Sequence, residues 1–163
     1  MESVLSLPID HLGIAVYSLE KAEPYYRTLG MRRVAHVEIP EIEARAALFA
    51  SGRSRIELLE PTAATSAVAA FLHRHGEGLH HVAFLCTNLR AELTRLRPGN
   101  PPRIQFLPID GARALWSAFL PPKPGHRIAT ELCQRAAPLV VAENAPHYAP
   151  ARAAHGQKVA SRR

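Results

Sequence analysis

An internal repeat constrains the fold of this chain more firmly than any other feature. Residues 79–86 repeat the apolar and polar pattern of residues 9–16, and each copy places a histidine at the same point. A glutamate flanked by apolar residues also recurs, and both pairs are separated by roughly 70 residues, as in a duplicated supersecondary unit. The recurring residues are His11 and His81, and Glu57 and Glu131. The repeat predicts two half-domains of similar structure.

Each half is predicted to be a strand, a helix and three further strands. In residues 9–16, apolar side chains alternate with a histidine and small residues, which predicts a strand with one apolar face. Ser18 is placed to cap the next helix, and Pro24 predicts that this helix begins late, near Lys21. The halves are expected at about 8–62 and 78–134, with a bridging helix at about 65–75. Two paired βαβββ units predict an α+β fold with a curved, partly open mixed sheet, whose concave face holds the site.

Composition and length predict one globular domain, at residues 1–134. The 163 residues are 47% hydrophobic and 21% charged, and no apolar run approaches the roughly 18 residues of a membrane span. The first residues lack the pattern of a secretory signal, and two cysteines are too few for a disulfide framework. We therefore expect a cytoplasmic protein without a membrane partner.

The formal net charge of +6 raises the possibility of a nucleic-acid partner, so its distribution matters. Residues 135–163 hold five basic residues and one acidic residue, which leaves the body with a net charge of only +2. The body carries no basic helix and no basic stripe interleaved with aromatic residues, so we expect no nucleic-acid partner. The segment 135–163 lacks a sustained period and is predicted to be a disordered basic tail.

The four recurring residues predict one metal site. A buried carboxylate without a partner costs several kcal/mol, and a cation held between two carboxylates and two imidazoles compensates for that cost. Two nitrogen and two oxygen ligands suit a divalent ion such as Co, Ni, Zn, Mn or Fe, and a six-coordinate ion keeps two positions for substrate. Such open positions permit Lewis-acid catalysis.

Three neighbouring residues are interpreted more conservatively. His80 is expected to point to the opposite face of its strand from His81, because neighbours in a strand alternate. Cys133 shares a face with Glu131, yet a small buried side chain is the simpler interpretation. Trp116 fits either the core or a pocket wall.

The stretch 9–134 resembles the vicinal oxygen chelate (glyoxalase) superfamily and, within it, the methylmalonyl-CoA epimerases. The motifs that carry the likeness are Ile9-Asp10-His11 and the segments 56–61, 66–72, 78–82 and 131–134. The resemblance implies that the four recurring residues bind the metal, with cobalt the first candidate. It also implies an acyl-CoA thioester as substrate, a homodimer, and a role for Glu131 in proton transfer.

Two departures from that family bear on the substrate pocket. A second carboxylate used by some members falls at Ala46, although Glu41 and Glu43 are near in sequence. The segments around Arg113 and Lys123 also differ, and these two basic residues are candidates to meet a substrate carboxylate or a CoA phosphate.

The leading hypothesis is a metal-dependent epimerase of a 2-substituted malonyl-CoA thioester, which acts by abstraction of the alpha proton and metal stabilisation of an enolate. A glyoxalase I-type lactoylglutathione lyase uses the same order of ligands and is the second hypothesis. A non-catalytic small-molecule binding protein of the same fold, with Trp116 in its pocket wall, is the third. An extradiol dioxygenase needs two histidines and one glutamate, so the additional Glu57 weakens that interpretation.

Overall fold

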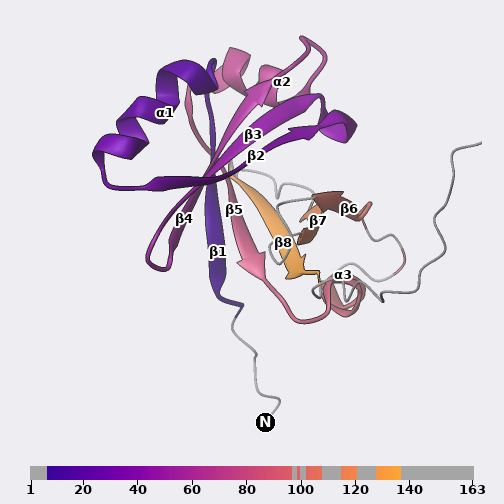
Figure 1. Ribbon diagram of the computed structural model, residues 1–163. Coiled ribbons are helices and arrows are strands. Elements are labelled where there is room, and N and C mark those ends of the chain that lie inside the picture. The colour runs from indigo at the N-terminus through magenta and orange to yellow at the C-terminus, as the bar shows by residue number, and fades with distance from the viewer. Residues whose placement is uncertain (1–6, 97–98, 100–101, 108–114, 121–127, 137–163) are drawn as a thin grey trace, which may run out of the picture.

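The computed structural model describes residues 7–96, 99, 102–107, 115–120 and 128–136 (Figure 1). Its elements, in chain order, are β1 (Ile9–Ala15), α1 (Leu19–Thr28), β2 (Arg32–Ile39), the short 3₁₀ helix η1 (Pro40–Ile42), β3 (Ala44–Ser51), β4 (Ser54–Pro61), α2 (Ala67–His75), β5 (Gly78–Leu85), α3 (Leu89–Leu96), β6 (Gln105–Leu107), β7 (Leu115–Leu120) and β8 (Ala129–Arg135). None of the helices in this described part combines the length and the apolar character needed to cross a membrane.

All of these strands belong to one sheet, in the order β2-β3-β4-β1-β5-β8-β7-β6. Strands β1 and β5 lie antiparallel at its centre, and each has a parallel neighbour on its outer side, β4 beside β1 and β8 beside β5. From the centre outward, the strands of the first half follow the order β1, β4, β3, β2, and those of the second half follow the matching order β5, β8, β7, β6. The prediction of two βαβββ units that form one curved mixed sheet is confirmed.

The sheet curls around one of its faces. Leu48 on β3 and Leu115 on β7 belong to the same buried cluster, although four strands separate β3 from β7 in the sheet. Helix α2 packs Val68 and Leu72 into that cluster and so covers part of the concave face. Helix α1 packs Leu19, and helix α3 packs Leu89 and Leu93, into separate clusters on the other face (Figure 1).

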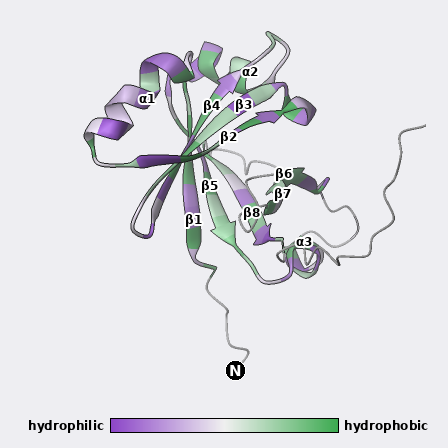
Figure 2. Ribbon diagram, viewed as in Figure 1, coloured by the Kyte–Doolittle hydropathy of each residue, from purple (hydrophilic) through white to green (hydrophobic). Residues whose placement is uncertain are grey.

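Hydropathy follows this arrangement. Hydrophobic residues dominate the central strand β5, whereas much of helix α1 is hydrophilic (Figure 2). Helix α1 nevertheless buries Leu19 against the sheet, at 3% exposure, while its outer residues face solvent.

Helix α1 begins earlier than the sequence predicts. The expected start near Lys21 is wrong, because the helix begins at Leu19 and holds Pro24 in its interior. Ser18 caps it as expected by accepting a hydrogen bond from the Lys21 amide at 3.4 Å. The carboxylate of Glu60 also accepts a hydrogen bond from the Leu19 amide at 2.8 Å. These contacts and the burial of Leu19 offset an interior proline, which costs about 3 kcal/mol.

The last strand extends one residue past the predicted boundary at residue 134. Arg135 ends β8 and contacts Asp10 on β1, so it belongs to the sheet. Residues 137–163, where the basic tail is expected, lie outside the described residues, and that tail stays a prediction.

Candidate metal centre

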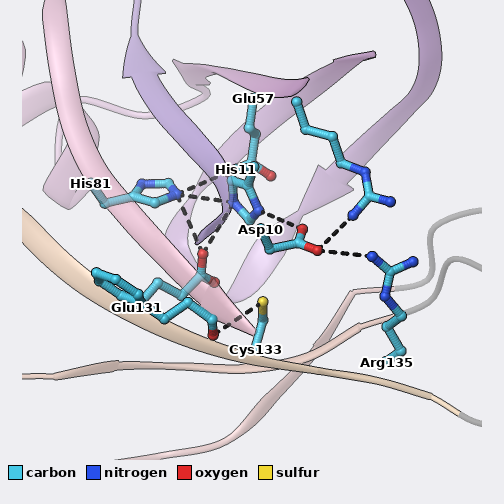
Figure 3. Close-up of polar contacts among 9 residues, drawn as sticks. Asp10, His11, Glu57, His81, Glu131, Cys133 and Arg135 are labelled. Carbon is cyan, nitrogen blue, oxygen red and sulfur yellow. Dashed lines mark hydrogen bonds and ion pairs between the residues drawn. The ribbon is translucent and has the colours of Figure 1, made fainter. Parts of the chain in front are cut away.

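The four side chains that recur in the sequence converge on the concave face (Figure 3). The Nε2 atoms of His11 and His81 lie 3.2 Å apart. Glu131 Oε2 is 3.3 Å from each of these nitrogens, and Glu57 Oε2 is 3.6 Å from that of His11 and 3.4 Å from that of His81. All four residues are buried, with exposures of 5% or less. The four side chains therefore lie together, as the repeat in the sequence predicts.

Strand pairing explains the convergence. Strands β1 and β5 are central neighbours, and their histidines lie diagonally across this strand pair, His11 opposite Ala83 and His81 opposite Gly13. Glu57 pairs with Gly13 in the parallel β1–β4 ladder, and Glu131 pairs with Ala83 in the parallel β5–β8 ladder. The repeat thus places one histidine and one glutamate on each side of the β1–β5 junction.

The charges of the cluster stabilise one another. Burial raises the pKa values of Glu57 and Glu131, but contacts with His11 and His81 outweigh burial, so the pKa of Glu57 lies far below its ordinary value and that of Glu131 falls to about 2. Burial lowers the pKa values of the two histidines, but the carboxylates, and for His11 also Asp10, raise them above the ordinary value. Both carboxylates are therefore ionised, and a bound cation would compete with protons for the imidazoles.

The donor set fits a divalent metal ion. Ligand atoms of His11, His81 and Glu131 all lie within 4.8 Å of one another, as one small ion requires. Glu131 Oε2 is buried without a hydrogen-bond partner among the described residues. A buried carboxylate oxygen in that condition is costly, and a cation at this position would satisfy it.

Asp10 lies directly behind His11, which sequence reasoning missed. The β1–β5 register shifts between Ile9 and His11, so Asp10 is an extra residue in β1 and does not simply alternate to the other face. Its Oδ2 lies 3.2 Å from His11 Nδ1, and its Oδ1 accepts hydrogen bonds from Arg55 at 2.5 Å and Arg135 at 3.1 Å. Burial raises the pKa of Asp10, but His11 and Arg55 outweigh it and keep the pKa below its ordinary value.

His80 lies directly behind His81, and its predicted orientation to the opposite face is wrong. The β1–β5 register also shifts between Gly13 and Ile14, which leaves His80 as the extra residue of β5. The Nδ1 atoms of His80 and His81 are 3.0 Å apart, and the His80 ring packs against Phe71 and Phe119. Burial and the nearby charge of His81 lower the pKa of His80 to about 4, so its ring is neutral near pH 7.

Cys133 is a buried packing residue, as the sequence suggests. Its thiol donates a weak hydrogen bond to the carbonyl oxygen of Phe84 at 3.5 Å. Burial, followed by the charges of Asp10 and Glu131, raises its pKa far above the ordinary value. The group is therefore a thiol and not the thiolate that binds metal well, although its Sγ is near ligand atoms of Asp10 and His11.

The remaining candidates add no acid–base group to the cluster within the described part of the chain. Ala46 is buried in the apolar core, at 1% exposure, and supplies no acid–base group. The carboxylate of Glu43 accepts a hydrogen bond from the Thr65 hydroxyl at 2.6 Å. Trp116 is 43% exposed and packs on Phe106, across strands β7 and β6 at one edge of the sheet. Arg113 and Lys123 lie outside the described residues, so their proposed roles stay predictions.

Comparison with known proteins gives the family. Residues 10–100 match the model of the Glyoxalase/Bleomycin resistance protein/Dioxygenase superfamily. The chain belongs to this superfamily. It is 36% identical over 127 residues to the uncharacterized protein YqjC of Bacillus subtilis (strain 168), covering 77% of this chain and 91% of that protein. It is also 30% identical over 128 residues to the mitochondrial methylmalonyl-CoA epimerase of Mus musculus, covering 77% of this chain and 72% of the relative.

Solved structures of epimerases in this superfamily share the fold. A Streptomyces coelicolor methylmalonyl-CoA epimerase in complex with 2-nitronate-propionyl-CoA has a TM-score of 0.65 and 35% identity, covering 81% of this chain and all (100%) of that one. The methylmalonyl-CoA epimerase of Mycobacterium tuberculosis has a TM-score of 0.67 and 29% identity, covering 83% and 93%. Both of these solved structures are named methylmalonyl-CoA epimerases.

Gly13 leaves room for the His81 ring, and a substitution at this position tests the packing of the site. A Cβ at Gly13 would overlap three atoms of that ring, its Cε1, Nδ1 and Nε2. We expect Gly13→Ala to lower the free energy of unfolding by about 1–3 kcal/mol, the usual cost of overpacking a core. Chemical denaturation measures this loss. Gly78→Ala, where an added Cβ meets nothing within 4 Å, is the control and should be close to wild type. Equal stability of the two variants would contradict the close contact.

Proposed function

We propose that this protein is a metal-dependent epimerase of a 2-substituted malonyl-CoA thioester. The observation that carries the proposal is the buried set of two imidazole nitrogens 3.2 Å apart with two carboxylates beside them. The epimerases among the relatives and solved structures support this choice over the glyoxalase I-type lyase and the non-catalytic binding protein. The cytoplasmic location and the homodimer remain expectations of the sequence.

His11, Glu57, His81 and Glu131 would hold the ion, with cobalt the first candidate and Ni, Zn, Mn or Fe as alternatives. When bound, a divalent cation supplies electrostatic stabilisation of the negative charge that develops on the thioester oxygen as the alpha proton leaves. The two histidines would hold the ion through ring nitrogens, and the two glutamates through carboxylate oxygens. The surrounding apolar cluster excludes water and strengthens these interactions.

Glu131 is the proposed acid–base residue. Contacts with the two histidines keep Glu131 ionised near pH 7, and the ionised carboxylate is the form that can accept the alpha proton of the substrate. Inversion of the centre needs a second proton donor on the opposite face. Ala46 cannot serve, and Glu43 is engaged by Thr65, so the proposal assigns proton abstraction to Glu131 and leaves the second donor unassigned.

Deuterium incorporation at the alpha carbon of methylmalonyl-CoA in heavy water tests the proposal directly. Chelator-stripped protein should be inactive, and added Co²⁺ should restore exchange. Mass spectrometry measures the exchange, and chiral analysis of the product measures inversion. Exchange with inversion supports the epimerase reaction. Exchange without inversion would contradict an epimerase and indicate a single functioning base. Absence of exchange with every divalent metal tested, despite stoichiometric binding, would contradict the proposal.

Glu131→Gln separates proton transfer from metal binding. A neutral amide can still offer an oxygen ligand but cannot take a proton, so we expect exchange to fall by about 10²- to 10⁴-fold, the usual contribution of general acid–base catalysis. Glu57→Gln is the matched control, because Glu57 is proposed as a ligand only and the same amide should preserve more activity. Equal losses in both variants at saturating metal would remove the special role of Glu131.

Asp10 is proposed to orient His11 for the metal. An ionised Asp10 favours the His11 tautomer that carries its proton on Nδ1, which leaves the Nε2 lone pair directed into the cluster. We expect Asp10→Asn to weaken Co²⁺ binding by about 10- to 100-fold, as loss of such outer partners usually does. Equilibrium competition with a chelating dye measures the affinity. A Co²⁺ affinity equal to that of wild type would show that Asp10 serves only to anchor the two arginines.

A further inference from the structure

A basic cavity adjoins the metal centre. Its volume is about 310 Å³, and its lining includes three arginines from three different strands, Arg32 on β2, Arg55 on β4 and Arg135 on β8. Asp10 lines the same cavity and also contacts His11, so one carboxylate joins the two features (Figure 3). Leu48 and Leu115 complete the wall toward the apolar core.

Strand register gives the position of this cavity relative to the metal ligands. Arg32 pairs with Ala50, and Ala50 pairs with Arg55, so these residues form one row across β2, β3 and β4. Arg55 lies two residues before Glu57 and therefore on the same face of β4, about 7 Å along the strand. Arg135 follows Glu131 and Cys133 on the same face of β8, beside Leu115 of β7. The arginine row is thus the next layer of the concave face beyond the metal ligands.

The positive charge of the arginines that line the cavity exceeds the charge needed to neutralise Asp10. The described lining residues include three arginines and a single carboxylate, that of Asp10. Arg55 and Arg135 each donate to Asp10 from one terminal nitrogen. Because a guanidinium carries five N–H donors, each of these arginines keeps donors for a second partner. Neutralisation of the buried Asp10 explains Arg55 and Arg135. It does not explain Arg32, which lines the cavity from β2, two strands away from Arg55 in the sheet.

We propose that this cavity is a binding subsite for an oxyanion of the substrate, either the carboxylate of the acyl group or a phosphate of the CoA portion. The inference rests on the proposed function, because it assigns the occupant to the same thioester that meets the metal centre. Guanidinium groups recognise both anions through charge-assisted hydrogen bonds. The adjacent row of metal ligands places the subsite close enough for one substrate to contact both.

Arg32→Gln is the discriminating variant, because Arg32 is outside the contacts that hold Asp10 among the described residues. Calorimetry on the full chain would measure the binding of malonyl-CoA, of propionyl-CoA, which lacks the acyl carboxylate, and of the 3′-dephospho form of each. We expect Arg32→Gln to weaken malonyl-CoA binding by about tenfold or more, as for the loss of a charged hydrogen bond. Arg53→Gln is the matched control, since Arg53 is exposed, lies in the nearby β3–β4 turn and is outside the cavity lining.

The pattern of losses identifies the occupant. A loss confined to malonyl-CoA supports a subsite for the acyl carboxylate. A loss shared by propionyl-CoA supports a subsite for a CoA phosphate, which is the 3′-phosphate if the 3′-dephospho forms show no loss and the diphosphate if they show the same loss. Equal affinities of wild type, Arg32→Gln and Arg53→Gln for all ligands would overturn the subsite. If methylmalonyl-CoA fails to exchange while Arg32→Gln still weakens malonyl-CoA binding, the reaction is wrong and the subsite stands.

Discussion

The antiparallel pairing of β1 with β5 is the contact on which the site depends. It brings the Nε2 atoms of His11 and His81 to 3.2 Å, and the absence of a side chain at Gly13 leaves room for the His81 ring. The parallel neighbours β4 and β8 then add one glutamate each. Four buried ionisable groups would be costly if separated, and their mutual contacts reduce that cost. Both halves of the repeat are therefore needed to assemble one cluster.

Two β-bulges make the cluster asymmetric. Asp10 and His80 occupy matching positions in the repeat, and each contacts the Nδ1 atom of the histidine that follows it. Asp10 is an anion held by two arginines, whereas His80 is a neutral ring packed against Phe71 and Phe119. The anionic neighbour raises the pKa of His11, and the neutral neighbour has no such effect on His81. The same kind of bulge in both strands thus gives His11 and His81 different electrostatic surroundings.

The sequence predicted the side-chain directions correctly where the two-residue alternation of a strand is unbroken, and incorrectly where a bulge interrupts it. The alternation in residues 9–16 and its repeat predicted the sheet and the four converging side chains. The position without a base at Ala46 came from the family resemblance and not from this period. The facing of Asp10 and His80 was missed, because a bulge shifts the two-residue period and leaves no mark in the sequence. The early start of α1 depends on Glu60, and the basic cavity combines three distant strands, so neither follows from local patterns.

The central claim is that the two halves hold one divalent ion between them. Titration of metal-free protein with Co²⁺, followed by its visible absorption, tests this claim most directly. We expect saturation at one equivalent, the weak bands typical of nitrogen and oxygen ligands, and loss of this binding in either His11→Ala or His81→Ala. Absence of saturable binding, or binding that survives both substitutions, would show that the converging side chains are an ion-pair cluster of the core and not a metal site.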